Sequence, residues 1–217
     1  MCNCQQCNAL TPRERTRDAV CLIARLLEPF GGTVIWMNCE DDPWGQRQET
    51  DHLRGMTGEI PGNAFIVTKQ KYWDFHSRWP RHPLYDTIAK DAEGKSPYMS
   101  ALQQPGEYHG CHEFPWCNVD EWSKAFRDMY EAGMQGVMVV AQVHHEGWDH
   151  PLNMVNWNAL TEYMHNPNAD PQQIKLSWAR KEFGFEVAST VVEVLNNVTE
   201  SARGAFEFDA LWTAFHS

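Results

Sequence analysis

Apolar and polar residues alternate along the chain in two different periods, and the first clear segment has the period of a helix. The sequence Thr11-Pro12-Arg13-Glu14 is typical of a helix start, because Thr and Glu can form a capping box and proline fits the first turn. Apolar residues follow at helical spacing until the glycine pair Gly31-Gly32 ends the segment. The positions that we expect to be buried are Ala19, Val20, Ile23, Ala24 and Leu27.

Four short apolar runs predict buried strands, because they are bounded by polar segments and three of them are rich in β-branched residues. The predicted strands cover residues 33–37, 64–68, 98–102 and 136–143. A helix precedes the fourth strand, with an expected buried stripe of Trp122, Ala125, Phe126, Met129 and Tyr130. Further helices are predicted over residues 152–165, 171–183 and 186–204.

This alternation of helices and strands is typical of an α/β protein with a parallel sheet. A TIM barrel needs eight strands, so four strands predict a partial (β/α)8 TIM-barrel-like fold. We expect half of a (β/α) barrel over residues 1–150 and a C-terminal helical segment over residues 151–217 that completes the barrel or packs on it. A half-barrel would expose apolar strand edges, so we expect it to need the missing barrel half or a second chain in a homo-oligomer.

Composition and charge narrow the function classes. The chain has 217 residues and a net charge of −11, and such a surface repels phosphate backbones, so nucleic acid is not an expected partner. No apolar stretch has the length of a membrane span, so no membrane partner is expected either. Ten Trp residues are compatible with stacking surfaces for sugars, although large aromatic side chains also fill cores.

The seven cysteines leave two interpretations open. An odd number in a chain of this length, without a signal peptide, favours reduced thiols and a cytoplasmic location. The close spacing of Cys2, Cys4 and Cys7 is also compatible with a zinc site that would take Cys21, Cys39 or a histidine as its fourth ligand. The expectation for the chain as a whole is that it holds no metal.

Two carboxylates follow predicted strands directly. Asp74 lies in the sequence VTKQKYWDFH, and Glu107 lies in LQQPGEYHG. The carboxyl ends of barrel strands carry the catalytic residues of that fold, and a pair of carboxylates is what glycoside hydrolysis requires. The aromatic neighbour Trp73 would desolvate Asp74 and raise the pKa of its carboxyl group. The alternative is a pair of solvated loop carboxylates.

Other polar and aromatic residues follow the same strands. Lys69 ends the second predicted strand, where its ammonium group could contact a substrate carboxylate. Trp148 and His150 belong to the sequence HHEGWDH after the fourth strand. That spacing differs from the HExxH pattern of zinc helices, so contacts to a polar substrate or to solvent are favoured over a metal site.

These segments, taken in order from residue 31 to residue 183, resemble the C-terminal half of the catalytic barrel of glycoside hydrolase family 67, the α-glucuronidases of xylan breakdown. GGTVIW is similar to the family's glycine pair and strand, and VTKQKYWDF followed by RHPL is similar to its Lys and Asp-Phe segment. QQPGEYHG resembles its Gln-Glu-Tyr-x-Gly element. The last resemblances are the Trp loop and Asn-Trp helix in GVMVVAQVHHEGWDHPLNMVNWNAL and the helix in NPNADPQQIKLSWARKEFG.

The resemblance implies an inverting α-glucuronidase without a cofactor, acting on the uronic acid side chains of plant-type polysaccharide fragments. Asp74 and Glu107 match the two carboxylates that activate the attacking water, and Lys69 matches a lysine that contacts the uronic acid. We also expect Trp73, Trp148 and His150 to line the sugar site. The expected partner is therefore an oligosaccharide substrate.

Two positions depart from the family pattern. Met37 stands where the family has an arginine that helps to hold the sugar, and residues 2–7 contain no carboxylate where the family's general acid is expected. Three alternatives follow: the acid precedes Met1 in a longer enzyme, which we favour, or a different residue supplies it, or the chain binds carbohydrate without catalysis. The sequence therefore predicts a glycosidase, with a non-catalytic carbohydrate-binding half-barrel as the alternative.

Overall fold

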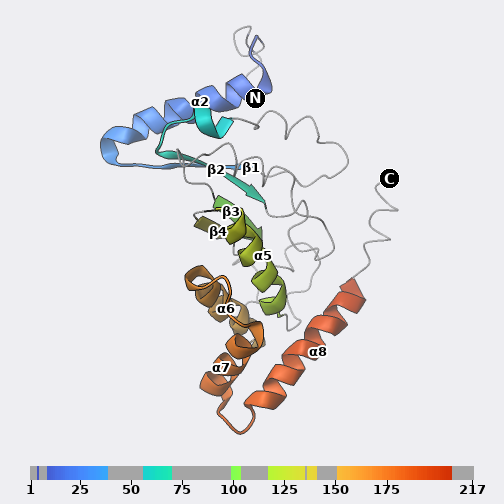
Figure 1. Cartoon of the computed structure of the whole chain (residues 1–217). Helices are drawn as coiled ribbons and strands as arrows, with labels where there is room; N and C mark the ends of the chain where they lie inside the picture. The colour runs from blue at the N-terminus through green and yellow to red at the C-terminus, as the bar shows by residue number, and fades with distance from the viewer. Residues whose placement is uncertain are drawn as a thin grey trace. The chain divides into compact units, whose positions relative to one another are not determined.

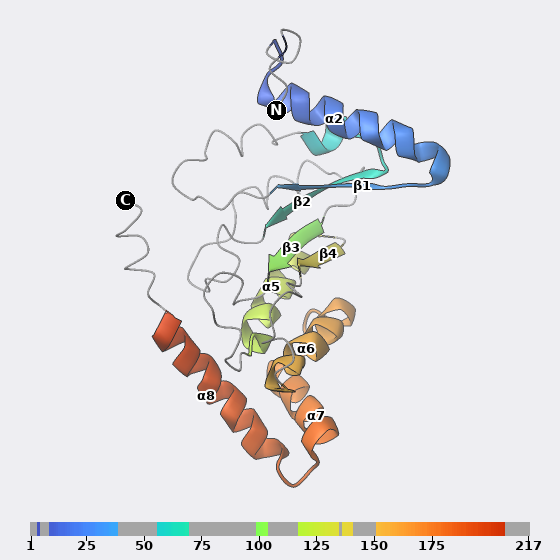
Figure 2. The same cartoon turned by 180° about the vertical axis from the view of Figure 1, so that it is seen from behind.

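The structure of the chain is a computed structural model, shown in Figures 1 and 2. The parts that it describes are residue 4 and residues 9–38, 56–69, 99–103, 117–134, 136–140 and 151–206.

The first helix among the described residues, α2 (Pro12–Leu27), begins as its sequence predicts. The Thr11 hydroxyl accepts a hydrogen bond from the Glu14 backbone N–H, and the Glu14 carboxylate accepts one from the Thr11 backbone N–H. The capping box is thereby confirmed. The helix ends one short turn before the glycine pair, in the 3-10 helix η1 (Glu28–Phe30), and Gly31 then adopts a left-handed conformation with φ 65°.

All four predicted strands are present and form one parallel sheet. They are β1 (Val34–Asn38), β2 (Ala64–Lys69), β3 (Met99–Gln103) and β4 (Gly136–Val140). Their order in the sheet is the order of the sequence, β1-β2-β3-β4, and every neighbouring pair is parallel. This sequential parallel order confirms the α/β fold class.

Helix α2 packs on β1 and β2 of the sheet (Figure 2). Val20 and Ala24 of the helix are fully buried in this core, where Trp36 of β1 packs against it. The buried members of the cluster are Val20, Ala24, Val34, Met56, Ile60, Ala64 and Ile66. The short 3-10 helix η2 (Met56–Glu59) contributes Met56 to it.

Within the described residues the other helices are α5 (Val119–Glu131), α6 (Met154–His165), α7 (Pro171–Phe183) and α8 (Ala188–Phe206), with a 3-10 turn η5 (Pro151–Asn153) before α6. The start of α7 follows from its sequence, because the Asp170 side chain accepts a hydrogen bond from the Gln172 backbone N–H and Pro171 fits the first turn. Helix α7 packs against both α6 and α8.

Two of the expected buried positions are wrong. Ile23 of α2 is 43% exposed and Tyr130 of α5 is 64% exposed. Each lies at the edge of its helix's apolar stripe. The core contacts are instead made by residues nearer the centre of the stripe, Val20 and Ala24 in α2 and Ala125 and Met129 in α5.

The chain divides into two compact units. The first comprises Met1–Gln104 with Met129–Ala141 and contains α2 and the whole sheet. The second comprises Pro105–Asp128 with Gln142–Ser217 and contains most of α5 with α6, α7 and α8. The boundary expected near residue 150 stays a prediction. In the part of the chain that is described, no helix is long and apolar enough to cross a membrane.

Candidate functional site

The carboxyl ends of the four strands form one edge of the sheet, and the predicted site residues follow this edge in the sequence. In the strand register Asn38 pairs with Thr68, Lys69 pairs with Ala101, and Gln103 pairs with Val140. Parallel strands that end together bring the segments after them to the same side of a sheet. Lys69 is the last residue of β2, as expected.

The other predicted site residues lie outside the described residues, so their roles stay predictions. They are Asp74, Glu107, Trp73, Trp148 and His150, together with Cys2 and Cys7 of the possible zinc site. Cys4 is described and is exposed. Within the described ranges, no group of three or more His, Cys, Asp and Glu side chains is placed to hold a metal ion.

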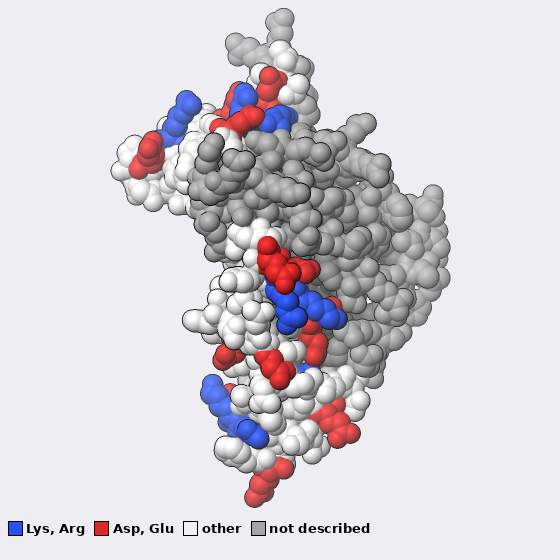
Figure 3. Space-filling view, in the orientation of Figure 1, with Lys and Arg blue, Asp and Glu red and all other residues white. Residues whose placement is uncertain are grey.

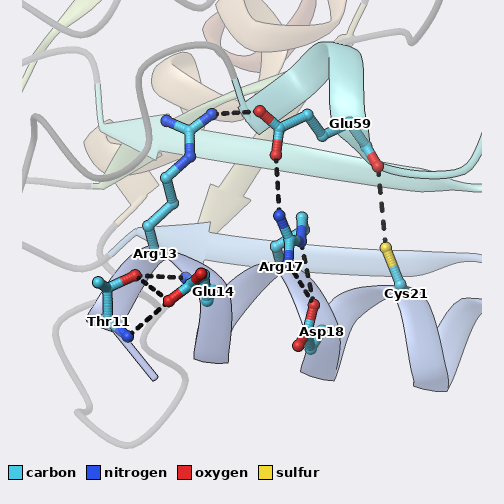
Figure 4. A network of polar contacts seen from close by, with 7 residues as sticks. All are labelled: Thr11, Arg13, Glu14, Arg17, Asp18, Cys21 and Glu59. Carbon is cyan, nitrogen blue, oxygen red and sulfur yellow. Dashed lines mark hydrogen bonds and ion pairs between the residues drawn. The ribbon is translucent and has the colours of Figure 1, made fainter. Parts of the chain in front are cut away.

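In the first unit, a polar network joins the outer side of α2 to η2 (Figure 4). The carboxylate of Glu59 accepts hydrogen bonds from Arg13 and from Arg17, the latter at 3.5 Å. Arg17 also donates to the neighbouring Asp18 at 2.9 Å. The thiol of Cys21 lies 3.9 Å from the Glu59 carbonyl oxygen. Glu59 is therefore contacted by Arg13, Arg17 and Cys21, all from α2.

This network determines the charge state of its members. The hydrogen bond from Arg13 lowers the pKa of the Glu59 carboxyl group, and Arg17 adds to that effect. The pKa of Glu14 is lowered by the hydrogen bond from the Thr11 backbone. The carboxylates are therefore ionised partners of arginine and of a helix N-terminus, and they are not poised as proton donors near neutral pH.

An open hollow of about 540 Å³ lies beside this network. Its lining residues are Arg17, Asp18, Cys21, Leu22, Arg25 and Glu59. Two guanidinium groups face two carboxylates there, so the formal charges of the lining cancel, and Arg17 is already bonded to both carboxylates. On the face seen in Figure 3 the described basic and acidic side chains are likewise interspersed. The hollow thus favours no particular class of ligand.

In the second unit, three side chains from α6 and α7 converge on the start of α5. Asn156 accepts a hydrogen bond from the Asn118 backbone N–H at 2.7 Å, and the Tyr163 hydroxyl donates to the Val119 carbonyl oxygen at 3.0 Å. The Lys175 ammonium donates to Asp120 in the first turn of α5 at 2.7 Å. We call these three side chains, Asn156, Tyr163 and Lys175, the α5 anchor.

All three members of the α5 anchor are buried. Lys175 has no exposed surface, Asn156 and Tyr163 are each 1% exposed, and the ring of Tyr163 stacks on Phe126 at 5.7 Å between ring centres. Asn196 of α8 also accepts a hydrogen bond from the Lys175 ammonium, at 2.6 Å. The bonds made by Asn156 and Tyr163 therefore lie where water competes little, which strengthens them, whereas the bond from Lys175 to Asp120 is partly buried.

Sequence reasoning missed the α5 anchor. Lys175 and its partner Asp120 are separated by 55 residues, and a lysine on a helix is normally solvated. One signal was present: Lys175 directly follows Ile174 in a helix whose other buried residues are apolar, so it lies within the apolar stripe of α7. A charge in such a stripe predicts a buried partner.

Burial also changes the acidity of the tyrosine in the α5 anchor. Desolvation raises the pKa of Tyr163 to about 12, and the nearby charge of Asp120 acts in the same direction. A hydrogen bond from Ser123 opposes the rise. The phenol therefore keeps its proton and remains a hydrogen-bond donor to Val119 throughout the neutral range.

Comparison with known proteins adds no family assignment, because neither a scan against protein-family models nor a search of curated proteins found a match.

Proposed function

We propose that the chain is a partial (β/α)8 barrel of an inverting glycoside hydrolase related to the α-glucuronidases, with Asp74 and Glu107 on the side of the attacking water. In this proposal one of the two carboxylates takes a proton from the attacking water and the other orients that water. The sugar bond breaks on the opposite face, where the departing oxygen takes its proton from a general acid that residues 2–7 do not contain. Lys69 contacts the uronic acid, and Trp73, Trp148 and His150 line the sugar. The cell process would be xylan degradation.

The observation that supports this proposal best is the parallel sheet in sequential order, whose strand ends precede each candidate residue. Asp74 follows Lys69, the last residue of β2, by five positions, and Glu107 follows Gln103, the last residue of β3, by four. Barrel enzymes carry catalytic groups in such segments. Sequential parallel order is also what successive β/α units of a barrel require.

A second observation supports a shared role for the segment that carries Glu107 and the histidine-rich segment. The two segments leave the sheet at neighbouring positions, because Gln103 of β3 pairs with Val140 of β4. They are followed by residues that also contact each other, since the Asn118 N–H donates to Asn156. The two segments thus begin after paired strand residues in the first unit and end before hydrogen-bonded residues in the second. We take this to favour one site to which both segments contribute.

The direct test is hydrolysis of a glucuronic-acid-bearing xylo-oligosaccharide by the wild-type chain and by Asp74→Asn and Glu107→Gln. We expect each substitution to lower kcat by about 100-fold or more, because general-base catalysis contributes on the order of 10²–10⁴-fold. Glu182→Gln is the matched control, since Glu182 is an exposed residue of α7 whose carboxylate lies 3.7 Å from the ammonium of the neighbouring Lys181. Wild-type rates in both site variants, with circular dichroism unchanged, would overturn the assignment.

A second candidate function is carbohydrate binding without catalysis, and it is favoured by the absence of a carboxylate in residues 2–7. α-Glucuronyl fluoride separates the two, because fluoride departs without a proton and therefore needs no general acid. Hydrolysis of the fluoride but not of the oligosaccharide would indicate a working base without an acid. Calorimetric binding of the oligosaccharide with neither substrate hydrolysed would identify a binder.

A further inference from the structure

The side of α2 that faces away from its core carries a second row of apolar residues. Leu22 is 59% exposed and Leu26 is 62% exposed, and Phe30 at the end of η1 is 84% exposed. Residues two positions apart lie on opposite sides of a helix, so Leu22 faces away from the buried Val20 and Ala24. Adjoining exposed apolar side chains typically mark an interaction surface. We call this row the Leu22 stripe, and its members are Ala19, Leu22, Ile23, Leu26 and Phe30.

The spacing and the local charge of the Leu22 stripe suit a helix that pairs with another helix. Ala19, Leu22 and Leu26 are separated by three and four residues, as in the apolar seam of a coiled coil. Residues 12–30 hold four arginines and three carboxylates, so this part carries a net charge of +1, whereas the whole chain carries −11. Two copies of the chain therefore repel each other less at α2 than at a surface of average charge.

Two opposite charges lie along one side of the Leu22 stripe. Asp18 and Arg25 are both exposed and are seven residues apart, which is close to two helical turns, so they share that side. In a parallel pair this side would face the other side of the partner's stripe, which carries the uncharged Thr16. In an antiparallel pair centred near Leu22, the same sides face each other, and Asp18 lies beside the partner's Arg25. The charges therefore favour the antiparallel arrangement.

We propose that a second copy of this chain docks on the Leu22 stripe, with the two α2 helices antiparallel and related by a two-fold axis near Leu22. The small Ala19 then lies beside the partner's larger Leu26, which lets the helices approach closely. The hollow of about 540 Å³ that Asp18 lines leaves space for the side chain of the partner's Arg25. A single pair of helices buries a small area, so we expect a dissociation constant of about 1–100 μM. This inference does not depend on the proposed function.

Leu22→Glu tests the apolar part of this surface, because it places two like charges beside the two-fold axis. Met164→Glu is the matched control, since it adds the same charge at a helical position of the second unit that is 57% exposed. Sedimentation equilibrium of the full chain measures the dissociation constant, and circular dichroism checks that each variant is folded. We expect Leu22→Glu to weaken the dimer at least about 30-fold and Met164→Glu to stay within about threefold of wild type.

Two outcomes of this experiment would overturn the proposal. The first is a wild-type chain that remains a monomer up to about 500 μM, well above the expected dissociation constant. The second is a wild-type dimer that Leu22→Glu leaves as tight as before, which would place the contact between copies on another surface.

The antiparallel direction has a test of its own, with substitutions that change only exposed side chains. Arg25→Glu puts a carboxylate beside the partner's Asp18, so we expect it to weaken the dimer about tenfold. Adding Asp18→Lys to the same chain brings opposite charges together again in reversed order, so the double variant should dimerise within about threefold of wild type. An unchanged dissociation constant for Arg25→Glu, or a double variant as weak as the single one, would overturn the antiparallel pairing.

Discussion

The ammonium group of Lys175 is completely buried, whereas the carboxylate that neutralises it, on Asp120, belongs to a side chain that is 38% exposed. Losing the partner therefore costs Lys175 more free energy than it costs Asp120. A buried charge that loses its partner keeps its full desolvation cost, while a carboxylate with access to water can be hydrated.

This inequality predicts different costs for the two single substitutions. Asp120→Asn leaves the Lys175 ammonium buried with only neutral acceptors, so we expect it to lower the free energy of unfolding by about 3 kcal/mol or more. Lys175→Met replaces the charge with an apolar side chain of similar length and leaves Asp120 to water, so we expect a loss of about 1–2 kcal/mol. Urea unfolding of both variants measures the difference, and an equal or reversed order would contradict it.

Tyr163 predicts how stability depends on alkaline pH. The pKa of this tyrosine is raised to about 12, so the folded protein holds the phenol proton more tightly than the unfolded chain, whose tyrosines titrate near their ordinary value of about 10. The corresponding stabilisation is fully present below about pH 10 and is lost as the pH rises toward about 12. The wild-type melting temperature should therefore fall more steeply over this range than that of Tyr163→Phe.

A matched control for this titration is Tyr130→Phe, because Tyr130 is 64% exposed. It should retain the steep alkaline loss of the wild-type chain. Equal pH slopes for Tyr163→Phe and the wild type, measured by thermal melts monitored by circular dichroism, would show that Tyr163 ionises as easily in the folded protein as in the unfolded chain.

The turn after α2 gives a prediction for the first unit. A Cβ atom added to Gly32 would lie 2.9 Å from the Leu27 Cβ and 3.3 Å from the Leu27 carbonyl oxygen, whereas one added to Gly62 would meet nothing within 4 Å. Gly32→Ala should therefore destabilise the chain by about 1–3 kcal/mol through steric overlap. Gly62→Ala should be neutral or stabilise it by up to about 1 kcal/mol. Chemical denaturation of the pair tests this, and equal effects would contradict the overlap.

Local sequence signals were sufficient for the elements of the fold. The capping residues at Thr11 and Glu14 specify the start of α2, and the proline after Asp170 specifies the start of α7, because each acts within one helical turn. Three of the four strands follow from runs that are rich in β-branched residues. Each of these signals lies within the element it specifies or within a few residues of it.

Contacts between distant residues could not be predicted in the same way. The bonds from Lys175 to Asp120 and from Tyr163 to Val119 span 55 and 44 residues, and no periodic pattern encodes such a pairing. The candidate site was predicted from the positions of residues after strands. β2 ends at Lys69, and the site itself stays a prediction. The roles of Asp74 and Glu107 depend on experiment.

The most direct test of the proposed function is the anomeric configuration of the first product, followed by proton NMR as the wild-type chain hydrolyses α-glucuronyl fluoride. An inverting site, in which carboxylates activate water on the face opposite the leaving group, predicts β-glucuronic acid as the initial product. The α anomer as the initial product would contradict an inverting mechanism. No product above the spontaneous rate would contradict the assignment of this chain as a glycosidase.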